Sequence, residues 1–215
     1  MQAWSWLLAN AAAISAAASI ATLLVWILYL QLFYAGYRRQ MRAKILITRG
    51  GGHSIKSRCI ITNMSPELVF VSAIVIELRF ENRALTCSLS DIERGSYDGR
   101  DRRSELLQGP LASGDYLDIG SFEELVSSGL EDKKLSLTMV DSINVIVAGN
   151  YALHDQLVAA ERSFDIQAVG ERQLIEPQQA TANQIRSRHG RRRIAALLRE
   201  LAARRPAEPH PMNCG

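Results

Sequence analysis

The sequence predicts a membrane-anchored all-β protein: one N-terminal transmembrane helix, a β-sandwich and a C-terminal amphipathic helix. Three observations predict this class. Residues 1–37 of the 215-residue chain carry no charged side chain. Residues 45–168 contain short runs of alternating or β-branched apolar residues between turn signals. Residues 181–205 contain eight arginines around regularly spaced leucines.

The distribution of charge divides the chain further. The formal charge of +3 at pH 7 conceals an acidic middle between two basic segments. We expect a transmembrane anchor helix over residues 1–37, a basic juxtamembrane segment over 38–44, and the sandwich over 45–168. A linker and basic amphipathic helix should follow over 169–206, and a disordered tail over 207–215.

The apolar N-terminal run, residues 4–37, is longer than a membrane span requires. About 20 helical residues cross the hydrocarbon core of a bilayer. Trp4 and Trp6 suit one membrane interface, and Tyr34 and Tyr37 suit the other. A secretory signal peptide would begin with basic residues and end at a cleavage site. This run begins as MQAWSW and continues through LLVWILYLQLF, so we expect a retained anchor.

Four basic residues and no acidic residue follow the span, namely Arg38, Arg39, Arg42 and Lys44. Basic flanks of a span stay in the cytoplasm. We therefore expect a single-pass protein of the cell (inner) membrane, with its N-terminus outside and its C-terminal domain cytoplasmic. The four basic side chains are then expected to contact anionic lipid headgroups.

The first half of the span, NAAAISAAASIAT (residues 10–22), is built from small residues. Small side chains let helix backbones approach closely, which drives association in lipid. A seven-residue repeat places four of them on one stripe, namely Ala12, Ser15, Ser19 and Thr22. The stripe predicts a self-association seam whose hydroxyls bond carbonyls of their own helix. A water-lined path around an oligomer axis and a lone helix are the alternatives.

The middle of the chain begins with three predicted strands, KILITR (44–49), RCIITNM (58–64) and LVFVSAIVIELRF (68–80). The third alternates, with Ile74, Ile76, Leu78 and Phe80 on one face. Val75, Glu77 and Arg79 lie on the other face, as in a half-buried strand. ENRALTCSL indicates the return strand of a hairpin.

A charged loop is expected over residues 91–104, followed by short strands at GDYLDIG and LSLTMV. FEELVSSG between them should form one or two helical turns. SINVIVAGNY (142–151) and QLVAAERSFDI (156–166) predict a closing antiparallel hairpin. About seven or eight short strands with few helical patterns are typical of an immunoglobulin-like β-sandwich.

The order KILITR, RCIITNMSPELVFVSAIVIELRF and INVIVAGNYALHDQLVAAERSFDI resembles the cytoplasmic domain of inward-rectifier potassium channels over roughly residues 38–168. The resemblance implies an immunoglobulin-like sandwich entered from a transmembrane helix and assembled around a symmetry axis. It also implies headgroup contacts for the basic residues after the span. This sequence has one span and no T-x-G-Y/F-G filter, so the resemblance does not imply potassium selectivity.

The C-terminal segment, residues 177–206, is predicted to be helical, with an interruption at Gly190. Its apolar face consists of residues at helical spacing, namely Ile194, Leu197, Leu198 and Leu201. Arginines flank this face, among them Arg191, Arg192 and Arg193. Such a helix suits contact with anionic lipid or an acidic partner. Docking onto its own acidic domain or a neighbouring subunit is the alternative. Nucleic acid is not expected, because no aromatic residue interleaves the arginines.

We find no catalytic, cofactor or metal motif in the sequence, and we expect a non-enzymatic protein. His53, His154, His189 and His210 lack metal-site spacing. RGGGHS lacks the lysine and helix of a phosphate cradle, and G-x-S-x-G does not occur.

The cysteines show no metal-type spacing. Cys59 is expected in the core because it lies in an apolar alternating run. A Cys59–Cys87 disulfide would need an oxidising compartment, which the predicted orientation argues against.

Three functions stay open at this point. The first is a single-pass protein that presents a cytoplasmic sandwich for self-association and partner docking. The second is a homo-oligomeric ion channel or pore with the sandwich domains as its gating ring. The third is an accessory subunit of a larger membrane complex. The expected partners are the bilayer with its anionic lipid, further copies of the chain and an unidentified protein.

Overall fold

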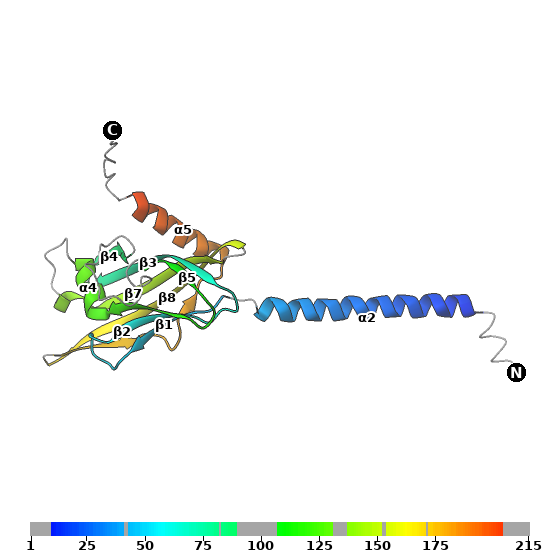
Figure 1. Cartoon of the computed structure of the whole chain (residues 1–215), viewed down its shortest axis with the longest axis horizontal. Helices are drawn as coiled ribbons and strands as arrows, with labels where there is room; N and C mark the ends of the chain where they lie inside the picture. Colours follow the sequence, from blue (N-terminus) through cyan, green and yellow to red (C-terminus); the bar gives the residue numbers. More distant parts are fainter. Residues whose placement is uncertain are drawn as a thin grey trace, which may run out of the picture. The chain divides into compact units, whose positions relative to one another are not determined.

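The structure is a computed structural model that describes residues 10–40, 43–81, 83–89, 107–130, 137–151, 154–170 and 172–203. These residues belong to two compact units, 1–42 and 43–215. Figure 1 shows the helix α2 in the first unit and strands with helices in the second.

The first unit contains the helix α2 (Ala11–Gln40). Its residues 11–37 are long and apolar enough to cross a membrane, with a mean hydropathy of 2.1. At about 1.5 Å per residue this stretch extends over about 40 Å, more than the roughly 30 Å of a hydrocarbon core. The predicted apolar N-terminal helix is thus confirmed over the described residues. Trp4 and Trp6 lie outside them.

The second unit is mostly β-sheet, and all its strand pairs are antiparallel. The smaller sheet has the order β1-β2-β6. Its strands are β1 (Ile45–Gly50), β2 (Arg58–Asn63) and β6 (Tyr116–Ser121).

The larger sheet has seven strands and the order β10-β8-β7-β3-β4, with β5 paired to β3 and β9 paired to β8. Its strands are β3 (Val69–Phe80), β4 (Arg83–Ser88), β5 (Gly109–Leu111), β7 (Ser142–Tyr151), β8 (His154–Val169), β9 (Arg172–Pro177) and β10 (Asn183–Gln184). The predicted β3–β4 and β7–β8 hairpins are both present.

Both sheets contribute side chains to one apolar core. Ile47 and Ile61 come from the smaller sheet and Ile76 from the larger one, and all three are fully buried. Phe122 and Phe164 meet with ring centroids 4.8 Å apart. Burial of this apolar surface is the main stabilising contribution to such a domain. The alternation predicted for residues 74–80 is confirmed, since its apolar set lies in this core.

Helix α4 (Phe122–Leu130) follows β6 and buries its apolar face in the same core. A capping box starts the helix. Ser121 Oγ accepts from Glu124 N at 3.2 Å, and Glu124 Oε2 accepts from Ser121 N at 2.9 Å. The nine-residue helix is slightly longer than the one or two turns predicted.

Residues 137–139 form the 3₁₀ turn η2 (Leu137–Met139), so the strand predicted at LSLTMV is wrong for these residues. Thr138 and Met139 are exposed, and only Val140 after them is buried. The alternation expected of a half-buried strand is therefore not realised here.

The larger sheet continues beyond residue 168, where the sandwich was predicted to end. Strands β9 and β10 both pair with β8. The helix predicted from residue 177 is wrong up to Ser187, because α5 (Arg188–Ala203) begins after it. Gly190 does not interrupt this helix. Its N–H donates to the N-cap Ser187 Oγ at 3.0 Å.

Strand β1 is joined to the larger sheet mainly by side chains. Gln184 of β10 accepts from Ile45 N at 3.0 Å and donates to Ile45 O at 2.6 Å. Arg49 donates to Ile175 O of β9. After β1, the turn residue Ile55 donates its N–H to Gln173 O at 3.0 Å. These bonds hold the two sheets together along one edge.

Cys59 of β2 is fully buried in the core, as predicted, and it forms no disulfide with Cys87. The Cys87 thiol instead donates to Gly129 O at 3.5 Å. Burial raises the pKa of Cys59, and the nearby Asp118 carboxylate raises it further, whereas Arg162 lowers it. The folded domain therefore keeps this thiol protonated in mildly alkaline solution.

The unfolding free energy should consequently fall as the pH rises above the unfolded-state thiol pKa of about 8.5. Above that pH the unfolded chain releases the Cys59 proton while the folded domain keeps it. Between pH 7 and pH 9.5 this group should remove about 1.4 kcal/mol of stability. Denaturant unfolding followed by circular dichroism measures the loss. A Cys59→Ala chain should show a shallower pH dependence, and equal slopes would contradict the prediction.

Candidate interaction sites

Helix α5 packs with its apolar face on the outer face of the larger sheet. Ile194 is fully buried there against Val75, Ile146 and Ala159. The other predicted apolar residues, Leu197, Leu198 and Leu201, are half-buried against the same cluster. In this arrangement the apolar face contacts the chain's own sheet, the alternative the sequence had left open.

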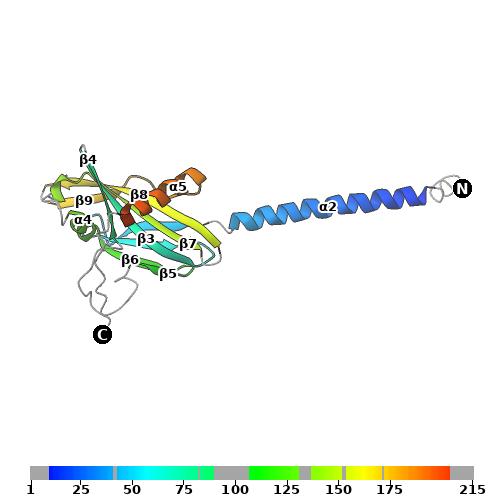
Figure 2. The same cartoon turned by 90° about the horizontal axis from the view of Figure 1, so that it is seen from above.

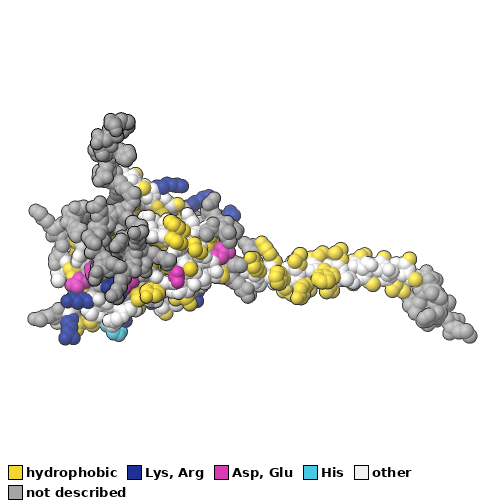
Figure 3. All heavy atoms as spheres, in the orientation of Figure 1, with side chains coloured by type: hydrophobic (Ala, Val, Ile, Leu, Met, Phe, Trp, Pro, Cys, Tyr) yellow, Lys and Arg dark blue, Asp and Glu magenta, His cyan; other side chains and the backbone are white. Residues whose placement is uncertain are grey.

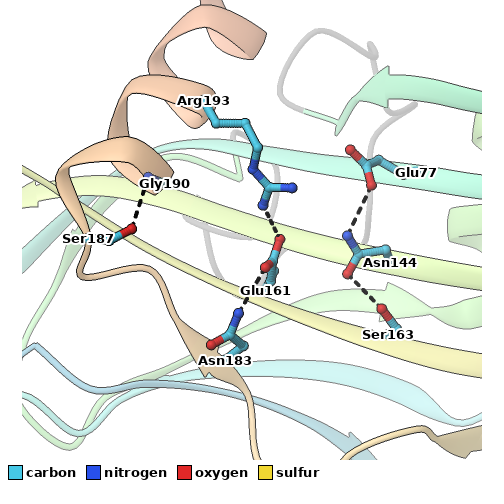
Figure 4. Close-up of polar contacts among 8 residues, drawn as sticks. All are labelled: Glu77, Asn144, Glu161, Ser163, Asn183, Ser187, Gly190 and Arg193. Atoms are coloured by element: carbon cyan, nitrogen blue, oxygen red, sulfur yellow. Dashed lines mark hydrogen bonds and ion pairs between the residues drawn. The ribbon is translucent and has the colours of Figure 1, made fainter.

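A polar cluster beside this contact joins α5 to the sheet (Figure 4). Arg193 Nη2 lies 2.5 Å from Glu161 Oε2 of β8. The other Glu161 oxygen accepts from Asn183 Nδ2 of β10 at 2.9 Å. One carboxylate therefore connects α5, β8 and β10. The Arg193 side chain is 54% exposed, so this ion pair stabilises weakly and mainly sets orientation.

A second polar row crosses the same face next to Glu161. Asn144 Nδ2 donates to Glu77 Oε2 at 3.1 Å, and Ser163 Oγ donates to Asn144 Oδ1 at 3.2 Å. The three residues are cross-strand neighbours on β3, β7 and β8. Figure 4 shows this row beside the Arg193–Glu161 contact. Hydrogen bonds within the row satisfy the polar groups on this part of the sheet.

The remaining predicted arginines of α5 differ in exposure. Arg192 is exposed, whereas Arg191 is half-buried. Arg199, another arginine predicted to flank the apolar face, is exposed as well, and so is Arg188. Figure 3 shows basic side chains gathered along the side of the domain that α5 forms in Figure 1. The helix thus presents a basic outer side while its apolar side is covered.

The predicted juxtamembrane cluster is described only at Lys44, whose side chain is exposed. The side chains of Arg38 and Arg39, and all of Arg42, lie outside the described residues. The Lys44 backbone is held on both sides. Its N–H donates to Ser65 Oγ at 2.9 Å, and its carbonyl accepts from Met64 N at 2.8 Å.

The turn that holds Lys44 is itself fixed by a fully buried asparagine, Asn63. Asn63 Nδ2 donates to the carbonyls of Glu67 and Leu111, each at 2.9 Å. Its Oδ1 accepts from Ser65 N at 2.9 Å. These three contacts give this end of the domain a defined backbone, and sequence patterns gave no signal for them.

Two hydroxyls of the predicted stripe in α2 bond carbonyls of their own helix. Ser19 Oγ donates to Ser15 O at 2.9 Å, and Thr22 Oγ1 donates to Ala18 O at 2.8 Å. Ala12 and Ser15 are exposed on the same helix. Whether the stripe contacts another helix stays a prediction.

Among the residues that the structure describes, no group of three or more histidine, cysteine, aspartate or glutamate side chains could hold a metal ion. His53 lies on the turn after β1, with its Nδ1 4.0 Å from Glu176 Oε1, and His189 is exposed on α5.

No known protein family matches this chain, and neither does any curated protein or solved structure. The chain is thus defined by its architecture, an apolar N-terminal helix joined to a two-sheet antiparallel domain with a docked C-terminal helix.

Proposed function

We propose that the protein is a non-enzymatic, single-pass membrane protein that self-associates through α2. It holds an immunoglobulin-like β-sandwich at the cytoplasmic face of the membrane, where the sandwich docks partners. The observation that carries this proposal is the uncharged stretch of 27 residues in α2, followed closely by a β domain.

The short link between the two units supports a tethering role. Only residues 41–44 separate Gln40, the last residue of α2, from Ile45, the first residue of β1. An extended chain covers at most about 18 Å over these five steps. A span that ends at Tyr37 therefore keeps the start of the domain close to the membrane surface.

Small residues on the α2 stripe support the self-association. The hydroxyls of Ser19 and Thr22 are bonded within their own helix, so they need no partner in lipid. The stripe therefore favours association of two helices mainly because its small side chains let the helix backbones approach closely. The size of its side chains should matter more than their hydroxyls.

Replacing Ser19 by leucine should therefore weaken self-association by about tenfold or more, equivalent to about 1.4 kcal/mol. Ser19→Ala should leave it nearly unchanged, because alanine is as small and the lost hydroxyl bond was internal. Energy transfer between donor- and acceptor-labelled full-length chains in liposomes, diluted with lipid, measures the dissociation constant.

Ala17→Leu is the matched control, because it adds the same bulk about 160° around the helix from Ser19. It should leave the dissociation constant unchanged. A strictly monomeric wild-type chain would contradict self-association. Equal effects of the two leucine substitutions would contradict the stripe as its surface.

A further inference from the structure

The fold brings the basic segment that begins at Arg186 to Ala43, where the chain enters the β domain. The two residues are more than 140 positions apart in the sequence. Arg186 Nη2 donates to Ala43 O at 3.3 Å. The preceding Gln184 is bonded to both backbone groups of Ile45. Helix α5 begins two residues after Arg186, and Figures 1 and 2 both show it starting at the end of the domain where the chain enters. Lys44, Arg186 and Arg188 therefore share one end.

Two exposed large side chains lie at the same end. Met64 is 50% exposed, and its N–H bonds the carbonyl of Lys44. Tyr116 is 67% exposed and pairs with Thr62 at the end of β2. An apolar thioether and an amphipathic phenol beside basic side chains have the composition of surfaces that bind at the membrane interface.

We propose that Lys44, Met64, Arg186 and Arg188 form a lipid-binding face that recognises the headgroups of anionic phospholipids. The proposal rests on the membrane tethering proposed above and assigns the surface of the domain that meets the bilayer. The basic residues attract the headgroup phosphates, and the Met64 side chain enters the layer between headgroups and acyl chains.

Acidic residues at this end do not cancel its charge. Glu67 and Asp115 lie in the turns that surround Asn63. Asp155 follows the β7–β8 turn at the same end, where Tyr151 pairs with Val69 and His154. Lys44, Arg186 and Arg188 equal these three acidic residues in number, and Arg38, Arg39 and Arg42 immediately upstream make the net charge positive. Each basic residue near an anionic leaflet contributes about 1 kcal/mol of attraction.

The tether favours lipid over a soluble acidic protein as the ligand. The at most about 18 Å of chain between Gln40 and Ile45 keeps this face near the headgroups at all times. An acidic protein would have to reach the face from solution, and it would leave the exposed Met64 side chain without a role.

The test uses the full-length chain in nanodiscs and hydroxyl-radical oxidation of methionine, read by mass spectrometry. Met64 and Met139 are exposed to similar extents, 50% and 57%. Met139 is the last residue of η2, and Asp141, two residues later, donates its N–H to Arg79 O near the far end of β3. Met139 therefore serves as an internal reference.

The oxidation of Met64 relative to Met139 is compared between discs with about 30 mol % phosphatidylglycerol and discs of pure phosphatidylcholine. The ratio should be about fivefold lower with phosphatidylglycerol, which is equivalent to about 1 kcal/mol. About 1 M salt should restore oxidation, because it shortens the screening length to about 3 Å.

Lys44→Glu combined with Arg188→Glu should abolish the protection. Arg188 is the first residue of α5, where glutamate is favourable for the helix, so this variant keeps its fold.

The matched control is Arg83→Glu combined with Arg172→Glu, an equal charge change at the exposed first residues of β4 and β9, which lie at the other end of the strands. It should keep the protection of Met64. Equal Met64 oxidation in both kinds of disc would overturn the proposal. So would protection by soluble polyglutamate without any effect of lipid charge. A chain that is extracted from discs by alkaline carbonate would instead defeat the proposed membrane tethering itself.

Discussion

Replacement of Arg162 by alanine is expected to lower the unfolding free energy of the β domain by about 3 kcal/mol. Arg162 lies on the inner side of β8 and is 9% exposed. Its guanidinium donates to the carbonyls of Ile47, Gln179 and Ala180, the last two at 2.9 and 3.0 Å. It also lies 5.4 Å from the centre of the Phe164 ring.

These contacts explain the size of the expected loss. Hydrogen bonds from a charged donor contribute roughly 1.5–3 kcal/mol each, and a buried carbonyl without a donor is costly. Arg162 joins β8 to β1 and to the connection between β9 and β10, so alanine would loosen the edge where the sheets are held by side chains. Lysine should restore only part of the loss, because it lacks the planar fork of arginine.

Labelling of the Cys59 thiol in increasing urea measures this unfolding in the full-length chain. Cys59 is fully buried, so a maleimide reaches it only when the domain opens, and mass spectrometry separates it from Cys87. Arg79→Ala, at an exposed side chain of β3, is the control and should change stability by less than about 0.5 kcal/mol. An Arg162→Ala chain with the wild-type urea midpoint would show that the three carbonyl contacts do not stabilise the domain.

Much of the sheet was predictable because its central strands are apolar and alternate. The periodicity of β3 and β8 and the apolar run of β7 identified the hairpins and the core face without any knowledge of their partners. Strands β9 and β10 were missed because they are short and polar, and they pair with β8 only after β8 is in place. Arg162 is a charged residue at an inward position, and its acceptor Ile47 lies 115 residues away. No local pattern reports such a contact.

The interaction sites show the same division. The spacing of apolar residues predicted the apolar face of α5, but it did not predict that this face packs on the larger sheet. The sequence predicted Val75 on the outward face of β3, beside Glu77 and Arg79. On the same face of the sheet, Ile146 and Ala159 join Val75 in an apolar patch that contacts Ile194. Likewise, charge counts revealed two basic segments, whereas only the bond from Arg186 to Ala43 shows that they meet. The capping box of α4, Ser121 with Glu124, could have been read from sequence.

Replacement of Gly149 by valine is expected to destabilise the domain by about 3 kcal/mol or more, at or above the upper end of the usual range for overpacking. Gly149 lies on β7 opposite Val71, next to an irregularity in the pairing of β3. A Cβ at this position would meet the carbonyl oxygen of Phe70 at 2.4 Å and its carbon at 3.1 Å. Both atoms belong to the backbone of the neighbouring strand, so no side-chain rotation can relieve the contact.

The backbone of Gly149 is not in the left-handed region, so its requirement for glycine is steric rather than conformational. Alanine should therefore also destabilise, though less than valine, since it introduces the same Cβ without further branches. Thermal unfolding of the full-length chain, followed by circular dichroism in the β-sheet region, measures both. Ala84→Val, at an exposed position of the strand β4, adds comparable bulk and should shift the midpoint little. If Gly149→Val and Ala84→Val unfolded at the same temperature, the close approach of β7 to β3 could not be the reason for glycine at this position.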